Sequence, residues 1–160
     1  LFPLYGPRDS VYPIGAAIGP GLPFGIGAAL AAPGRKTVCM CGDGGFALSL
    51  AELWTAKKEQ ADVVFLVMND GGYGVIRHIQ NRMYGGRNYY DDVLSPELEP
   101  LAALVGMPFA RVQSTDQLGP SVAAALAVDG PALVEVDMAA IGEFPAYFAP
   151  PPYAADEAAE

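Results

Sequence analysis

The chain has 160 residues, of which 52% are hydrophobic and 17% charged, and its formal net charge at neutral pH is -9. This size and composition predict about one domain with a packed core. With only nine Lys and Arg residues, general nucleic-acid binding is excluded, because it depends on cations that neutralise phosphates. An anionic ligand would need a metal ion, backbone amides or a helix N-terminus instead.

Targeting and membrane features are missing from the sequence. It contains no signal peptide, no lipidation motif and no apolar run of about 18 residues, so we expect a cytoplasmic protein without membrane contact. Cys39 and Cys41 are the only cysteines, and two reduced core thiols are favoured over a metal or redox site. Because the sequence starts at Leu1 rather than Met, we expect it to be part of a longer polypeptide.

The first part of the chain predicts an irregular lead-in followed by helix, strand, helix and strand. Residues 1–13 are rich in Pro, Gly and aromatic residues. Residues 18–32 place small and apolar residues at near-helical spacing, which indicates a closely packed helix. Residues 37–41 and 63–68 predict buried strands, and residues 46–58 predict the helix between them. The inward face of that helix is predicted to hold Leu48, Leu50, Leu53 and Trp54.

The second part continues the alternation of helices and strands. Residues 75–80 predict the start of a helix, and the polar connection at residues 81–95 is long enough to act as a lid. Thr115 or Asp116 is expected to cap a later helix. The remaining elements are predicted in the order helix, strand, helix, strand at residues 96–105, 109–112, 116–128 and 132–136.

This alternation predicts an α/β fold that is doubly wound, with a mainly parallel sheet and helices on both faces. Residues 1–143 are expected to form the single domain. Residues 144–160 are rich in proline and are predicted to form an extended tail on a surface.

Two acidic residues follow consecutive strands of the predicted sheet. Asp43 stands in GDGG at residues 42–45, and Asp70 stands in NDGG at residues 69–72. Because carboxyl ends of parallel strands meet at one edge of a sheet, we expect the two carboxylates to converge there. Such hard oxygen ligands suit a magnesium ion that carries a diphosphate, and glycine amides suit the phosphates. For either motif alone, an ordinary turn with a solvated Asp is the alternative.

Three segments resemble the diphosphate-binding domain of thiamine-diphosphate-dependent enzymes, in the branch that contains acetolactate synthase and benzoylformate decarboxylase. They are IGPGLPFGIGA at residues 18–28, GDGGF at 42–46 and MNDGGYG at 68–74, and the similarity runs from about residue 15 to residue 137. The resemblance implies thiamine diphosphate and Mg²⁺ as cofactors. It also implies an enzyme that decarboxylates a 2-oxo acid and ligates the resulting carbanion to a second carbonyl. A benzoylformate-type decarboxylase and a subunit of a split decarboxylase are the alternatives within the family.

The resemblance also implies the site residues. Asp43 and Asp70 would be the side-chain ligands of magnesium, and the Gly72 carbonyl would be the backbone ligand. The family usually has Asn where this chain has Asp70, so Asn69 is the alternative ligand if the register slips by one residue. The remaining cofactor-binding residues would be Ala16, Ile18, Gly42, Gly44, Gly45, Tyr73 and Gly74.

The resemblance also implies that four apolar residues lie near the reacting part of the cofactor. Ile18 stands where the family has a large apolar residue beneath the thiazolium ring, and the Ala16 carbonyl would accept a hydrogen bond from the amino group of the cofactor. Val75 and Ile76 would line the substrate pocket. Since pyruvate-decarboxylase-type members have an acidic residue at Ile76, the carboligating or aryl-oxoacid branches are favoured. Arg77 is interpreted as a solvated helix charge, with a substrate carboxylate as the alternative partner.

The resemblance further implies that this chain is incomplete as an enzyme. In the family, the cofactor lies between this domain and a pyrimidine-binding domain whose glutamate activates it, so no catalytic residue is assigned here. We expect that domain on the same chain or another one, in a homodimer or tetramer. A middle domain that binds FAD is compatible with the resemblance.

Two interpretations outside this enzyme class stay open. A Rossmann-type oxidoreductase is suggested by Gly19-Pro20-Gly21 before a glycine-rich helix, but no strand clearly leads into it and no acidic residue follows at the distance of a ribose contact. A non-catalytic regulatory or assembly subunit is the other interpretation. The joint presence of Asp43, Asp70 and Ile18 argues against it.

Overall fold

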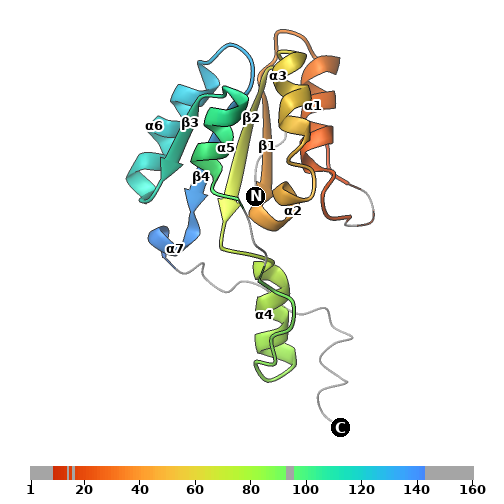
Figure 1. Ribbon diagram of the computed structural model, residues 1–160, viewed down its shortest axis with the longest axis vertical. Helices are drawn as coiled ribbons and strands as arrows, with labels where there is room; N and C mark the ends of the chain where they lie inside the picture. Colours follow the sequence, from red (N-terminus) through yellow and green to blue (C-terminus); the bar gives the residue numbers. More distant parts are fainter. Residues whose placement is uncertain (1–8, 14, 16, 93–95, 143–160) are drawn as a thin grey trace.

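The strands of the structure are β1 (Thr37–Gly42), β2 (Val63–Asn69), β3 (Phe109–Val112) and β4 (Ala132–Asp137). They form one parallel sheet in the spatial order β1-β2-β4-β3 (Figure 1). The structure is a computed structural model, and it describes residues 9–13, 15, 17–92 and 96–142. Ala16, residues 1–8 of the lead-in and the predicted tail at 144–160 lie outside the described residues.

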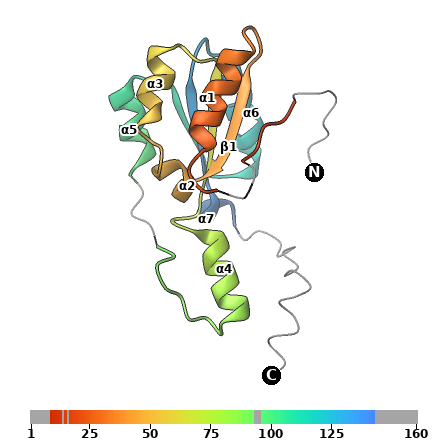
Figure 2. The same ribbon diagram turned by 90° about the vertical axis from the view of Figure 1, so that its right-hand side faces the viewer.

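Helices cover both faces of the sheet, as predicted (Figure 2). On one face α1, α3 and α5 pack over Phe65 and Leu133, and on the other face α6 and α7 pack over Val134 and Val136. The doubly wound α/β prediction is therefore confirmed. The helices are α1 (Gly21–Ala31), α2 (Asp43–Ala47), α3 (Glu52–Lys58), α4 (Gly74–Met83), α5 (Leu98–Val105), α6 (Thr115–Leu126) and α7 (Met138–Ile141).

The two central strands explain why the sequence contains continuous apolar runs. In β2, Val63, Val64, Phe65 and Val67 are all fully buried, because helices cover the strand from both sides. Strand β1 differs, since it buries Cys39 but leaves Val38 and Met40 about half exposed. The prediction of a buried strand at residues 37–41 is wrong on this face, because the apolar cluster that α6 covers is built from β2, β3 and β4 and contains no residue of β1.

The predicted helix at residues 46–58 is broken into α2 and α3. Bonds of the i to i+3 type, such as Ser49 N to Phe46 O at 3.1 Å, tighten the backbone between the two helices. The Ser49 hydroxyl also donates to the Gly19 carbonyl at 2.7 Å, which fixes the break against the segment before α1. This shift of helical phase leaves Leu48 and Trp54 exposed, so their predicted inward positions are wrong, whereas Leu53 is fully buried as predicted.

Smaller predictions had mixed outcomes. Helix α6 begins after Ser114 rather than after Thr115 or Asp116, because Ser114 is the last residue with extended backbone. Cys39 is buried and Cys41 is partly buried, and the hydrogen bond between their side chains together with burial raises the pKa of Cys41. Within the described ranges, no helix is both long enough and apolar enough to cross a membrane.

Candidate functional site

The two acidic turns meet at the carboxyl edge of the sheet. Asp43 is the first residue of α2, directly after β1, and Asp70 directly follows β2, the neighbouring parallel strand. Asp43 is almost fully buried. The pKa of Asp70 is raised by burial first, and then by the charge of Asp43 and a hydrogen bond to its carboxyl group. The predicted convergence of these two carboxylates is therefore present in the structure.

Glycines let the two turns approach each other closely. A Cβ atom on Gly44 would lie 2.6 Å from the Tyr73 ring and 3.3 Å from the carbonyl oxygen of Gly72. A Cβ atom on Gly74 would lie 1.6 Å from Oδ2 of Asp70, because that carboxylate folds back over the start of α4. A side chain at either position would displace the Tyr73 ring or the Asp70 carboxylate, and the Gly72 carbonyl lies beside the first turn.

The segment before α1 closes the site from the side of the first turn. The Cγ1 atom of Ile18 lies 3.7 Å from the position that a Cβ atom of Gly45 would occupy. The Ile18 side chain is 57% exposed, which places an apolar group at the surface next to the GDGG turn. Gly42, the last residue of β1, has extended backbone and leads directly into α2.

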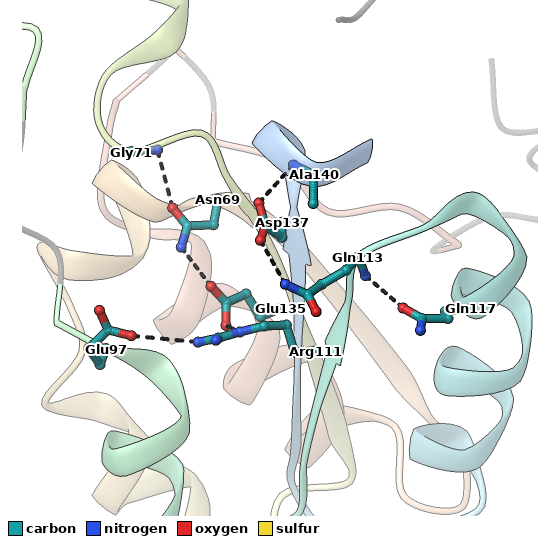
Figure 3. Close-up of polar contacts among 9 residues, drawn as sticks. All are labelled: Asn69, Gly71, Glu97, Arg111, Gln113, Gln117, Glu135, Asp137 and Ala140. Atoms are coloured by element: carbon teal, nitrogen blue, oxygen red, sulfur yellow. Dashed lines mark hydrogen bonds and ion pairs between the residues drawn. The ribbon is translucent and has the colours of Figure 1, made fainter. Parts of the chain in front are cut away.

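Asn69 lies beside these residues but uses both ends of its amide elsewhere (Figure 3). Its Nδ2 donates to Oε1 of Glu135 at 2.7 Å, and its Oδ1 accepts from the Gly71 N–H at 3.2 Å. This arrangement favours Asp70 over Asn69 as the residue that faces Asp43.

Arg77 braces the second turn from α4, and sequence analysis missed this role. Its Nε donates to Oδ2 of Asp91 at 2.7 Å, and its Nη atoms lie 3.4 and 3.3 Å from the carbonyl oxygens of Asp70 and Gly71. The Tyr73 N–H donates to the Asp91 carbonyl at 2.8 Å. The prediction of a solvated Arg77 holds only in part: its side chain is 35% exposed, but the connection after α4 folds back to supply Asp91 as an ion-pair partner, which no local pattern indicates.

Helix α4 extends beyond the sheet edge and carries the predicted pocket residues (Figures 1 and 2). None of its side chains is fully buried in the described part of the chain. Val75 is 68% exposed and Ile76 44% exposed, so both apolar side chains are accessible from outside. The site thus has an apolar rim on α4 and at Ile18, around a polar centre at Asp43 and Asp70.

The donor set fits magnesium in chemical type. Two carboxylates and the Gly72 carbonyl come together at the contact of the two turns. Magnesium prefers six oxygen ligands, and phosphate oxygens and water molecules often supply several of them. Over the described residues, no group of three or more His, Cys, Asp or Glu side chains is placed to hold a metal alone. A shared ion with phosphate ligands therefore fits this edge better than an ion held wholly by side chains.

The Rossmann alternative is not supported by the backbone around Gly19-Pro20-Gly21. Residues 9–13, 15 and 17–20, the described residues before α1, contain no strand. A dinucleotide fingerprint requires a strand that runs directly into the glycine turn. The strands that do run into glycine turns are β1, which leads into GDGG, and β2, which leads into NDGG.

Comparison with known proteins identifies the family of this chain. Residues 2–136 match the family described as "Thiamine pyrophosphate enzyme, C-terminal TPP binding domain". The chain is 35% identical over 119 residues to acetolactate synthase of Bacillus subtilis, an alignment with 74% of this chain and 21% of that protein. It is 28% identical over 130 residues to benzoylformate decarboxylase of Pseudomonas aeruginosa, with 81% of this chain and 25% of that protein.

A solved structure shares the fold as well. The thiamine diphosphate-dependent 4-hydroxybenzoylformate decarboxylase of Rhodococcus jostii RHA1 superimposes with a TM-score of 0.68 at 32% identity, over 74% of this chain and 23% of that one. The present chain thus spans about a fifth to a quarter of the length of these relatives.

Proposed function

Since this chain belongs to the thiamine pyrophosphate enzymes as their C-terminal TPP-binding domain, we propose that its Asp43–Asp70 edge holds the diphosphate of the cofactor through a magnesium ion. The observation that carries this proposal is the convergence of the two carboxylates beside the Gly72 carbonyl. Asp43, Asp70 and the Gly72 carbonyl would be the ligands from this chain. Phosphate oxygens and water would complete the six positions.

The diphosphate itself would lie along the first turn. Gly42, Gly44 and Gly45 carry no side chains that could block the approach of a phosphate to the backbone amides. Tyr73 and Gly74 close the opposite side, since Gly44 packs against Tyr73 and Gly74 lies beneath Asp70. Both turns would therefore contact the diphosphate of the cofactor.

Ile18 would support the ring system of the cofactor. Its exposed side chain lies next to Gly45, so it would meet the cofactor just beyond the diphosphate. When bound, thiamine diphosphate supplies the electron sink for decarboxylation, and the protein supplies anchoring, orientation and exclusion of water. The Ala16 carbonyl keeps its predicted role as acceptor for the amino group of the cofactor.

Completion of the pocket would come from a pyrimidine-binding domain on the same or another chain. Val75, Ile76 and Ile18 are exposed apolar residues on the rim of the site, and such a rim is typical of a surface that another domain covers. A homodimer or tetramer would bring the two domains together. A cytoplasmic location and an FAD-binding middle domain stay predictions.

The substrate of the complete enzyme would be a 2-oxo acid. Acetolactate synthase of Bacillus subtilis is among the relatives, which supports decarboxylation followed by ligation to a second carbonyl. Benzoylformate decarboxylase and 4-hydroxybenzoylformate decarboxylase support the second candidate, decarboxylation of an aryl 2-oxo acid. The apolar side chain of Ile76 is compatible with both.

Calorimetry of thiamine diphosphate binding to the full-length or partner-reconstituted protein tests the proposal. We expect binding that requires Mg²⁺ and that Asp43→Ala abolishes. Glu52→Ala is the matched control, because Glu52 is a carboxylate on α3 that the proposal leaves out of the site. Magnesium-independent binding, or equal loss in both variants, would contradict the proposal.

A further inference from the structure

Glu135 is a buried carboxylate within the otherwise apolar run of residues 132–136 in β4. It is 4% exposed, and its neighbours Val134 and Val136 belong to the core. A buried carboxylate is costly unless it is paired and hydrogen-bonded. The magnesium and diphosphate contacts proposed above leave Glu135 without a role.

The partners of Glu135 form a polar row across three strands (Figure 3). Its Oε1 accepts from Nδ2 of Asn69 on β2 at 2.7 Å, and its Oε2 accepts from Nε of Arg111 on β3 at 2.8 Å. Arg111 also forms an ion pair of 3.6 Å with Glu97, just before α5. The row therefore runs from the start of α5 through the sheet to the residue that precedes Asp70.

An ionised carboxylate only accepts hydrogen bonds, and this property fixes the orientation of Asn69. Because Glu135 takes the NH₂ group of Asn69, the carbonyl oxygen of Asn69 must point the opposite way. There it accepts from the Gly71 N–H at 3.2 Å, across Asp70. Bonds of this kind, from an Asn side chain to the backbone two residues on, define the shape of a turn.

We propose that Glu135 is a positioning residue for the metal turn, which acts through Asn69 to hold Asp70 beside Asp43. Arg111 secures Glu135 from the far side. This inference rests on the proposed function, because the position of Asp70 affects magnesium only if Asp70 is a ligand. Partners of this indirect kind typically change metal affinity by about 10- to 100-fold.

Glu135→Gln tests this role in the full-length protein. The amide can still accept from one neighbour, but its NH₂ group then faces the other donor, Asn69 or Arg111. We expect the apparent dissociation constant for Mg²⁺, measured through thiamine diphosphate binding, to rise about tenfold. Amide hydrogen exchange at Gly71 should accelerate in the absence of any cofactor.

Asp137→Asn is the matched control for this change. Asp137 lies two residues further along β4, and its carboxylate bonds to the Ala140 N–H at 3.0 Å and to Gln113 at 3.3 Å, not to the metal turn (Figure 3). The same chemical change at Asp137 should leave the apparent dissociation constant for Mg²⁺ within about twofold of the wild-type value. The rate of amide hydrogen exchange at Gly71 should not change.

A double variant separates positioning from a general loss of stability. In Asn69→Asp/Glu135→Gln, the Gln NH₂ can donate to the new Asp, and the Gln oxygen can accept from Arg111. We expect each single change to weaken Mg²⁺ binding and the double change to restore it to within about threefold of the wild type. If Glu135→Gln does not fold, Asn69→Asp and the double variant still decide the test.

The outcomes distinguish this inference from the function on which it rests. If the wild-type protein binds no thiamine diphosphate in the presence of Mg²⁺, the proposed function is wrong. Wild-type binding with an unchanged magnesium constant in Glu135→Gln, or an Asn69→Asp variant that binds Mg²⁺ more tightly than the wild type, would overturn the role of Glu135 alone.

Discussion

The two turns that present Asp43 and Asp70 are held in place in different ways. The first turn continues directly into α2, in which Asp43 and Phe46 are each 1% exposed. The second turn continues into α4, which has no buried side chain in the described structure. It is held instead by the hydrogen bond that the Gly71 N–H donates to Asn69 and by those that Arg77 donates to the carbonyl oxygens of Asp70 and Gly71.

This difference teaches which changes each turn tolerates. A turn that is fixed by close packing is sensitive to added volume, since interiors leave little free space. A turn that is fixed by polar contacts is sensitive to the loss of donors and acceptors. The site therefore joins a turn anchored in the core to a turn that depends on its hydrogen bonds.

Added volume in the first turn should have the largest effect. In Gly44→Ala, the new Cβ would lie 2.6 Å from the Tyr73 ring and 3.3 Å from the Gly72 carbonyl oxygen, so the Tyr73 ring must move and we expect the second turn to shift with it. We expect the activity of the assembled enzyme to fall about 100-fold, because displacement of a binding group by about 1 Å can cost that much. Steady-state kinetics at saturating Mg²⁺ and thiamine diphosphate would measure the loss.

Gly27→Ala is the control for this prediction. No atom lies within 4 Å of a Cβ at Gly27, which is inside α1. The change should leave activity intact and stabilise the helix by roughly 0.5–1 kcal/mol. Full activity in Gly44→Ala would break the distinction between the two turns.

Loss of a donor at the second turn should have an intermediate effect. Arg77→Met removes the contacts to the carbonyl oxygens of Asp70 and Gly71 and the ion pair with Asp91. If about 1 kcal/mol of hydrogen bonding is lost, magnesium-dependent cofactor binding weakens about fivefold. Hydrogen exchange at the Tyr73 amide should accelerate, because its acceptor is the Asp91 carbonyl.

Arg82→Met removes the same charge from the last turn of the same helix and should change neither quantity. Equal effects of the two arginine substitutions would indicate a general charge effect rather than a brace.

The smallest expected effect concerns pH. The pKa of Asp70 in the folded protein is raised above 3.8, so the unfolded state loses this proton first. Without metal, the stability contributed by protonated Asp70 is fully present below pH 3.8 and is lost as the pH rises through the folded pKa. Asp70→Asn should flatten this part of the stability curve, as thermal unfolding at a series of pH values would show. An unchanged slope would contradict a raised pKa at Asp70.

The convergence of Asp43 and Asp70 was predictable from the sequence, because each follows an apolar strand and the two strands are consecutive in a parallel sheet. The polar row formed by Asn69, Glu135 and Arg111 was not predictable from the sequence. Glu135 is 66 residues from Asn69 and becomes its neighbour only because β4 pairs with β2. A glutamate within the apolar run of residues 132–136 was the available signal, but strand order is needed to find its partners.

Other differences between prediction and structure arise from tertiary contacts in the same way. The helix break near Ser49 depends on its bond to Gly19, and the return of Asp91 to Arg77 depends on the path of the connection after α4. The half exposure of Met40 reflects how the helices are distributed over the sheet. Local periodicity carries no information on any of these contacts.

A crystal structure of the full-length protein with thiamine diphosphate and Mn²⁺ would test the central claim most directly. Mn²⁺ prefers oxygen ligands as Mg²⁺ does, and its anomalous scattering locates the ion. The account predicts one anomalous peak at about 2.1 Å from oxygens of Asp43, Asp70 and the Gly72 carbonyl, with Asn69 still bonded to Glu135. A peak coordinated by Asn69 in place of Asp70, or a diphosphate bound away from these two turns, would contradict it.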